Sequence, residues 1–316
     1  MQKEIGGYFE LEKYNMPMLY EDGILLNCGR NCLAYLIQTK EIKKIFLPKL
    51  DCDSVVNICR REQIEYSYYS IQKNWIPEEF ELGDGEWLYC VNYYGQLSND
   101  LIKQLKDKYE NIIIDNTQAY FQPPVNGIDT IYTCRKYFGV SDGAILFTDK
   151  TIDNELEQDK SLERMKFVLG RFENSANEYY QLSHDNNMDF DKEPIKEMSK
   201  ITNNLLHSID YQKVKEIRKD NYQYLNSKLG SINKLNLLQP EGPFAYPFLV
   251  ENGDILRDKL IKEKIYVSVL WDETLKICRP NELEYQLAKD VLPIPVDQRY
   301  NTKDMEHIVN IIKNNI

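Results

Sequence analysis

Two residues that could do chemistry together are Asp115 and Lys136, which lie 21 positions apart. Asp115 ends an apolar run of three isoleucines (112–114), a pattern typical of a buried strand. Lys136 follows a second short run, 128–133, and precedes a turn that contains two glycines. Pyridoxal phosphate (PLP) needs a lysine amine and a carboxylate that faces its pyridine nitrogen. The pair therefore suits PLP chemistry, although a strand ending in Asp and a solvated lysine are also common without any cofactor.

The elements around these residues predict an α/β fold with a mainly parallel sheet. Short apolar runs alternate with amphipathic stretches, and this alternation is typical of strands joined by right-handed helical crossovers. Asp115 would then lie at the carboxyl edge of the sheet, where ligands bind in such folds. The predicted strands are 25–26, 45–47, 64–71, 87–91, 112–115, 128–133 and 144–148, with helices starting near Gly29, Ser54 and Ser98 or Asn99.

The helix that starts at Gly29 is a candidate anion site. Glycine lets an anion approach the backbone amides, and the helix dipole favours negative charge at this end. Many helices begin after a glycine, so a glycine at a helix start is by itself a weak indication of an anion site.

Two segments resemble a known family. The stretches IIIDNTQA (112–119) and YTCRKYFGVSDGA (132–144) resemble those of the DegT/DnrJ/StrS family of PLP-dependent sugar aminotransferases, which have the aspartate-aminotransferase-like fold. The resemblance implies that Asp115 and Lys136 are catalytic. Asp115 would face the pyridine nitrogen, Gln118 would bind the ring hydroxyl, and Lys136 would be the Schiff-base lysine.

The same resemblance implies the rest of a cofactor site. Around Asp115, Gln118 and Lys136 it adds Gly29, Arg30 and Asn31 at the phosphate, Cys52 beside the ring, Asn92 of the VNYYG segment over the cofactor, and Thr133. Two features depart from the family pattern. The loop 50–53 lacks the aromatic residue that usually stacks on the ring, and the segment whose Asn and Arg reach a neighbouring active site is not found.

The resemblance and the pattern together predict two domains. Residues 1–205 would form the large PLP-binding domain, beginning with an extended arm to about residue 22, and residues 206–316 a small α/β domain. In the small domain we expect a strand at 248–250, a helix at 255–263, a strand at 265–269 and a final helix capped by Thr302. Helices with apolar positions at Leu162, Met165, Val168 and Leu169 are expected after residue 149.

The resemblance implies an activity and a partner. The chain would be an aminotransferase that moves an amino group from glutamate or glutamine to a keto-sugar nucleotide by a ping-pong mechanism. It would work as a homodimer, in polysaccharide biosynthesis. One alternative is a catalytically silent relative that binds PLP or serves in regulation. Two further alternatives are less consistent with the sequence. A PLP-dependent sugar dehydratase of this family would carry histidine where this chain has Lys136. A nucleotide-binding Rossmann protein would show G-x-G-x-x-G after a strand, and this motif is not found here.

Composition narrows the partners further. With a net charge of -11, the chain is a poor candidate for binding nucleic acid or an anionic membrane surface. Seven scattered cysteines predict free thiols and a cytoplasmic location rather than a disulfide framework. With only three histidines, we expect no metal centre. No apolar run approaches the length of a membrane span.

Overall fold

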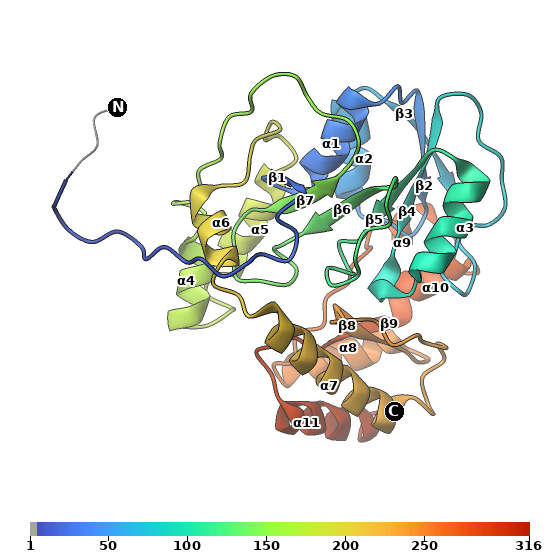
Figure 1. The fold of residues 1–316 in the computed structure, drawn as a ribbon. Helices are drawn as coiled ribbons and strands as arrows, with labels where there is room; N and C mark the ends of the chain where they lie inside the picture. Colours follow the sequence, from blue (N-terminus) through green and yellow to red (C-terminus); the bar gives the residue numbers. More distant parts are fainter. Residues whose placement is uncertain (1–4) are drawn as a thin grey trace.

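A seven-stranded sheet forms the centre of the computed structural model, which describes residues 5–316 (Figure 1). Its strands lie in the order β1-β7-β6-β5-β4-β2-β3. They are β1 (Ile24–Leu26), β2 (Lys44–Pro48), β3 (Glu65–Tyr69), β4 (Glu86–Val91), β5 (Ile112–Asp115), β6 (Asp129–Thr133) and β7 (Ala144–Phe147).

The predicted mainly parallel sheet is confirmed. Strands β3, β2, β4, β5 and β6 pair in parallel, whereas β7 runs antiparallel to both β6 and β1. A parallel pair needs a crossover of a dozen or more residues. The connection 134–143 between β6 and β7 is shorter and contains no helix, so the chain turns back instead.

Helices flank the sheet and form part of the connections between its strands. They are α1 (Gly29–Thr39), α2 (Asp53–Arg61), the 3-10 turn η1 (Tyr93–Gly95), α3 (Asn99–Tyr109), α4 (Lys166–Glu173), α5 (Tyr180–Asp189) and α6 (Lys200–Leu206). The N-cap of α3 is Ser98, whose side chain accepts the backbone N–H of Leu101, as its position predicts. Helix α1 buries seven consecutive residues, 31–37, against the sheet and α2.

Residues 211–316 are defined here as the C-terminal unit. Most of this unit lies below the sheet in Figure 1, whereas its residues 274–290 lie at the level of the sheet. Its elements are α7 (Tyr211–Leu229), β8 (Ala245–Leu249), α8 (Gly253–Lys262), α9 (Thr274–Ile277), α10 (Leu283–Asp290), β9 (Val291–Pro295) and α11 (Thr302–Lys313). Strands β8 and β9 pair antiparallel, and a second hydrophobic core forms around them from residues such as Leu225, Phe248, Leu260 and Ile312.

Two expectations for the C-terminal unit were wrong, and one of its strands was missed. Ile265 and Val267 are buried and Tyr266 is exposed, as in a strand, but no strand among the described residues pairs with them. The second strand of this unit is β9, which the sequence analysis did not identify. The N-cap of α11 is Asn301, whose capping box with Asp304 satisfies the helix start in place of the predicted Thr302.

The segment around α4 also differs from its prediction. Leu162 and Leu169, expected on an apolar helix face, are 71% and 57% exposed, while Met165 is buried. The apolar spots therefore do not form one buried stripe in this chain.

The N-terminal residues extend away from the body of the molecule (Figure 1). The predicted arm is extended from residue 5, and residues 1–4 lie outside the described part. Tyr8 and Phe9 are each 98% exposed. The backbone N–H of Tyr14 donates to Asn204 Oδ1 (3.0 Å) and that of Met16 to the carbonyl of His207 (3.0 Å), which ties the base of the arm to α6.

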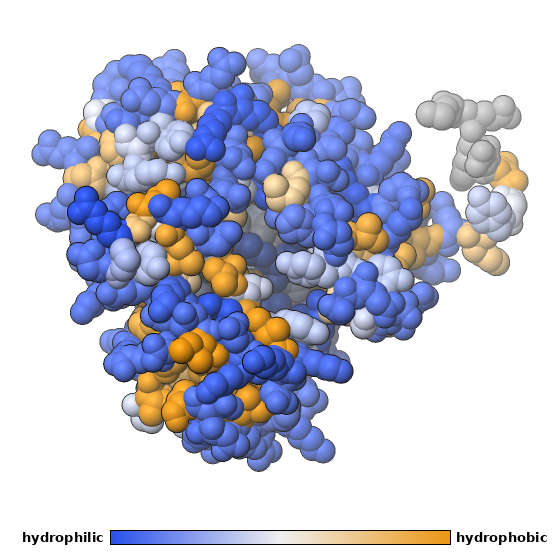
Figure 2. Space-filling view, turned by 180° about the vertical axis from the view of Figure 1, so that it is seen from behind, coloured by the Kyte–Doolittle hydropathy of each residue, from blue (hydrophilic) through white to orange (hydrophobic). Residues whose placement is uncertain are grey.

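The surface opposite to the view of Figure 1 is largely hydrophilic, and its apolar residues gather toward the C-terminal unit (Figure 2). Among residues 5–316, no helix combines the length and the apolar composition needed to cross a membrane.

Candidate active site

Asp115 is held at the carboxyl end of the central strand β5. Its side chain is 6% exposed, and the three isoleucines before it are buried on both faces of the sheet. One carboxylate oxygen accepts the hydroxyl of Tyr89 (2.8 Å) and the other accepts the backbone N–H of Thr117 (2.8 Å). Burial, and then the charge of Asp115, raises the pKa of Tyr89, so the tyrosine keeps the proton that it donates. A carboxylate has about four acceptor positions, so Asp115 can bind a further donor.

Lys136 reaches the same place from the connection between β6 and β7. Its side chain is exposed, and its Nζ donates to Thr117 Oγ1 (3.1 Å). Thr117 therefore contacts both the lysine amine and the carboxylate of Asp115. The structure brings together the two residues that the sequence analysis placed in the centre of the site. Thr117 itself was missed, although it lies between Asp115 and Gln118 in the segment that suggested the site.

Gln118 lies beside this pair and is 3% exposed. Its side-chain oxygen accepts the backbone N–H of Tyr94 (2.9 Å), so its amide N–H group is the part left to reach a ligand. Tyr94 has a left-handed backbone (φ 53°), which turns the chain sharply after β4 and carries that N–H toward Gln118.

The start of α1 lies at the same edge of the sheet. A Cβ built on Gly29 would lie 3.8 Å from Thr117 Cγ2 and 3.9 Å from Thr133 Cβ, which is ordinary van der Waals contact. The residue before the helix, Cys28, makes no side-chain cap hydrogen bond. No N-cap side chain therefore takes up the first backbone N–H groups of α1, and these groups are a candidate anion site next to Thr117 and Thr133.

Arg30 and Asn31 point away from this helix start toward residues 187–194. Arg30 forms an ion pair with Asp191 (2.8 Å) and donates to the carbonyl of Asn187 (2.9 Å). The buried amide of Asn31 donates to the carbonyl of Pro194 (2.8 Å) and accepts from Arg61 (2.8 Å). Both side chains hold the 187–194 segment against α1, so the contribution left to them at the anion site is that of the backbone.

Arg135 is a charged neighbour that sequence reasoning missed. Its guanidinium lies 4.7 Å from the centre of the Phe190 ring and donates weakly to Asn187 Oδ1 (3.3 Å). Its Nε is buried and has no hydrogen-bond partner among residues 5–316. Burial lowers the pKa of Arg135 to about 10, but the group remains charged at neutral pH. The signal in the sequence that could have identified Arg135 is its position directly before Lys136.

The loop after β2 brings a second carboxyl group to the site. Asp51 is 7% exposed; one side-chain oxygen accepts the backbone N–H of Cys52 (2.7 Å), and the other is buried without a partner among the described residues. Burial raises the pKa of Asp51 well above its usual range, the charge of Asp115 raises it further, and Lys136 lowers it. Asp51 is therefore within electrostatic reach of both central residues, although the sequence analysis named only its neighbour Cys52.

Asn92 and Cys52, two other predicted cofactor-binding residues, make contacts only with neighbouring protein groups. The buried amide of Asn92 donates to Asn116 Oδ1 and Gln122 Oε1 (both 2.9 Å), and its oxygen accepts the N–H of Leu97 (2.9 Å). Its polar atoms thus lock the turn after β4. Cys52 is half-buried at the start of α2, with its sulfur 3.4 Å from Asp53 Oδ1.

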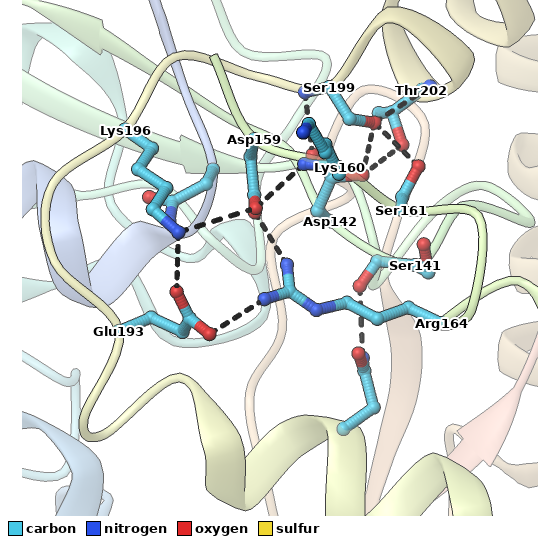
Figure 3. A network of polar contacts seen from close by, with 12 residues as sticks. Ser141, Asp142, Asp159, Lys160, Ser161, Arg164, Glu193, Lys196, Ser199 and Thr202 are labelled. Carbon is cyan, nitrogen blue, oxygen red and sulfur yellow. Dashed lines mark hydrogen bonds and ion pairs between the residues drawn. The ribbon is translucent and has the colours of Figure 1, made fainter. Parts of the chain in front are cut away.

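A polar network holds the last residues of the connection 134–143, which carries Lys136 in its first half (Figure 3). Asp142 accepts the backbone N–H and hydroxyl of Ser199 (both 2.8 Å) and the hydroxyl of Thr202, which fixes the connection to the start of α6. Arg164 bridges Asp159 and Glu193 in the same network. These contacts hold the backbone beyond Lys136 in one conformation.

A separate cluster places Cys278 Sγ and carboxylate oxygens of Glu282 and Glu284 within 4.8 Å of one another. Lys49 Nζ lies 2.6 Å from Glu282, and the backbone N–H of Ile71 donates to Glu284 (2.8 Å). Protein donors already satisfy these oxygens, so the cluster joins the C-terminal unit to the sheet domain.

Comparisons with known proteins bear on the fold. No family model and no curated protein match the sequence. Among solved structures, a DegT DnrJ EryC1 StrS aminotransferase from Brucella abortus is similar with a TM-score of 0.61 and 14% identity, covering 92% of this chain and 85% of that chain. A protein described as a sugar aminotransferase from Streptococcus pneumoniae, in its PLP form, gives 0.62 and 12%, covering 94% and 88%.

PseC of Helicobacter pylori, an aminotransferase involved in the biosynthesis of pseudoaminic acid, is similar with a TM-score of 0.60 and 11% identity, covering 92% of this chain and 85% of that chain. These long, low-identity matches agree with the α/β architecture. The chain therefore has the fold of the DegT/DnrJ/EryC1/StrS aminotransferases.

Proposed function

We propose that this protein is a PLP-dependent aminotransferase that moves an amino group from glutamate or glutamine to a keto-sugar nucleotide. The observation that carries the proposal is the bridge formed by Thr117. This residue contacts the carboxylate of Asp115 and the amine of Lys136, beside the uncapped start of α1.

The residues present fit the cofactor. Asp115 has acceptor capacity left for a pyridinium N–H, and Lys136 offers a primary amine at hydrogen-bond distance from Thr117. The first N–H groups of α1 are donors suited to a phosphate. Thr133, buried next to Gly29, adds a hydroxyl to the same side.

When bound, PLP supplies a carbonyl for attachment to an amine and a ring that accepts electrons from the substrate. The chain's own residues would do the rest. The negative charge of Asp115 would keep a proton on the ring nitrogen, which strengthens electron withdrawal. Lys136, released when the amino donor binds, would carry a proton to and from the reacting carbon of the substrate.

The experiment is a PLP titration of the purified protein, followed by absorbance, borohydride reduction and mass spectrometry of the labelled peptide. We expect a visible band and a cofactor mass fixed on Lys136. Lys136→Ala should lose both, while the matched control Lys150→Ala, an exposed lysine at the end of β7, should keep both. Labelling spread over surface lysines, or a normal band in Lys136→Ala, would contradict the assignment.

Activity is tested separately, by adding glutamate to the PLP-loaded protein and then a panel of keto-sugar nucleotides. Conversion of the bound cofactor by glutamate should occur without acceptor, as a ping-pong mechanism requires. Lys136→Ala should abolish turnover, because the variant loses both the amine that holds the cofactor and the general acid–base group. A rate equal to that of the unchanged protein would remove Lys136 from this role.

A catalytically silent PLP-binding protein is the second candidate. It is favoured by Asp51, a second buried carboxyl near Asp115 in the loop that lacks a stacking aromatic ring. A protein that binds PLP on Lys136 but does not exchange with glutamate or glutamine would support this function over the first.

We also propose that the protein is a homodimer. The exposed aromatic residues of the arm, Tyr8 and Phe9, support a contact with a second copy. Light scattering coupled to size-exclusion chromatography should give twice the chain mass, and deletion of residues 1–12 should weaken the dimer. A fully active monomer would refute this part of the proposal.

A further inference from the structure

A buried arginine of the C-terminal unit contacts the turn that carries Lys136. Arg218 lies in the middle of α7 and is 1% exposed. Its Nη2 donates to the carbonyl of Tyr137 (3.3 Å), the residue directly after Lys136. The guanidinium also lies over the Tyr137 ring, 4.5 Å from its centre.

A second donor converges on the same carbonyl. Gln298, in the loop after β9, donates from Nε2 to the Tyr137 oxygen (2.7 Å) and accepts from Arg218 Nε (2.8 Å). The two side chains therefore form a closed arrangement with the backbone of Tyr137. On its other side, Tyr137 donates its N–H to Cys134 (3.0 Å) and accepts the N–H of Tyr120 at its hydroxyl (3.2 Å).

The same guanidinium fixes an aromatic ring beside the lysine amine. Arg218 Nη1 donates to the carbonyls of Pro243 (3.0 Å) and Phe244 (3.4 Å). The Phe244 ring lies 5.9 Å from Lys136 Nζ. One side chain thus holds both the backbone next to Lys136 and the ring over which its amine lies.

The chemistry of Arg218 indicates a geometric role. Its direct hydrogen-bond partners are neutral oxygens, and the nearby carboxylate of Asp297 is paired with Arg299 (2.7 and 2.9 Å). Burial lowers the pKa of Arg218 to about 10. Burying a charge without an ion pair is unfavourable. What arginine offers here is a rigid, planar set of five donors, which neither lysine nor an apolar residue can reproduce.

We propose that Arg218, with Gln298, is a positioning residue for Lys136. The pair sets the position of the lysine-bearing turn and of the Phe244 ring, so that Lys136 Nζ meets Thr117 and the carboxylate side of the site. The inference rests on the proposed function for its catalytic meaning, but the contact itself can be tested in protein without cofactor.

The experiment compares Arg218→Lys and Gln298→Met with Arg257→Lys. Arg257 is a matched control because it is also buried (7% exposed) in the C-terminal unit and donates to two backbone carbonyls, those of Lys289 (3.0 Å) and Val291 (3.1 Å). Three quantities are measured: the acetylation rate of Lys136 in cofactor-free protein, the pH midpoint of the absorbance of PLP-loaded protein, and kcat and KM.

We expect Arg218→Lys to raise the acetylation rate of Lys136 several-fold and to shift the absorbance midpoint. It should lower kcat by about tenfold or more with little change in KM, because the reacting amine is misplaced. Gln298→Met should show the same changes in smaller size, and Arg257→Lys should show none of them at a comparable loss of urea resistance.

Variants that match Arg257→Lys in all three measurements would overturn the proposal. If Arg218→Lys does not fold, Gln298→Met decides by itself. If the unchanged protein shows no PLP band, the proposed function fails, while the acetylation rates still show whether Arg218 positions Lys136.

Discussion

Replacing Asp51 by asparagine should make the protein more stable at neutral and alkaline pH. The folded structure buries this carboxyl near the charge of Asp115, with one oxygen hydrogen-bonded to Cys52 N–H and the other unpartnered among the described residues. Burial first, and then Asp115, raises the pKa of Asp51 well above its usual range. The protonated form is thus favoured in the folded protein and disfavoured in the unfolded chain.

The direction and the size of the stability change follow from proton linkage. An aspartate in the unfolded chain titrates near pH ~3.9. Above that pH the unfolded chain releases a proton that the folded protein retains, so stability is full below this value and is lost as pH rises toward the raised pKa of the folded state. The loss is about 1.4 kcal/mol per pH unit in this window, and at most about 4 kcal/mol by pH 7.

Asparagine does not ionise, so Asp51→Asn removes this pH-dependent loss of stability, but it introduces a smaller cost of its own. Its oxygen can still accept the N–H of Cys52, but a buried NH₂ group without an acceptor costs about 1–3 kcal/mol. We therefore expect Asp51→Asn to be more stable than the unchanged protein at pH 8, by at most about 3 kcal/mol, and to lose this advantage toward pH 4.

The assay is urea unfolding of the cofactor-free protein between pH 4 and 8.5. Asp107→Asn, which removes an exposed carboxylate from α3, is the control for net charge and should change stability by less than about 0.5 kcal/mol at every pH. A difference between Asp51→Asn and the unchanged protein that does not grow with pH would refute the reasoning, as would a loss of stability at pH 8.

Three further substitutions test the packing behind the site by urea unfolding at pH 8. Asn92→Ala should cost about 2–4 kcal/mol, because it leaves the N–H of Leu97 without its acceptor and takes a donor from the side-chain oxygens of Asn116 and Gln122. Unchanged stability of Asn92→Ala would contradict this expectation. Phe248→Ala should cost about 3–5 kcal/mol and expose the C-terminal unit to protease, since the ring is fully buried in the second core. Gly143→Ala should cost at least about 1 kcal/mol, because its φ is +108° and a Cβ would lie 2.9 Å from Thr202 Cγ2; unchanged stability would show that the turn adapts.

Sequence alone determined the elements that carry the chemistry. Three isoleucines before Asp115 predicted a buried strand, and the alternation of strands and helices predicted the mainly parallel sheet. Both follow from short-range side-chain patterns, which local backbone preference and burial decide. Residue types and spacing suggested the pairing of Asp115 with Lys136, the family resemblance supported it, and the contacts of Thr117 show how the two residues meet.

The C-terminal unit shows where that reasoning stops. Residues 265–269 have the burial alternation of a strand, yet the place beside β8 is taken by β9, since strand pairing depends on which segment the chain brings alongside. The same limit hid Asp51, Arg135 and Arg218. Asp51 and Arg135 adjoin the predicted site residues Cys52 and Lys136, but the burial and the charged or aromatic surroundings of all three residues come from segments far away in the chain. Tertiary structure alone therefore decided which charges surround Lys136, because electrostatic environment is set by distance in space and not in sequence.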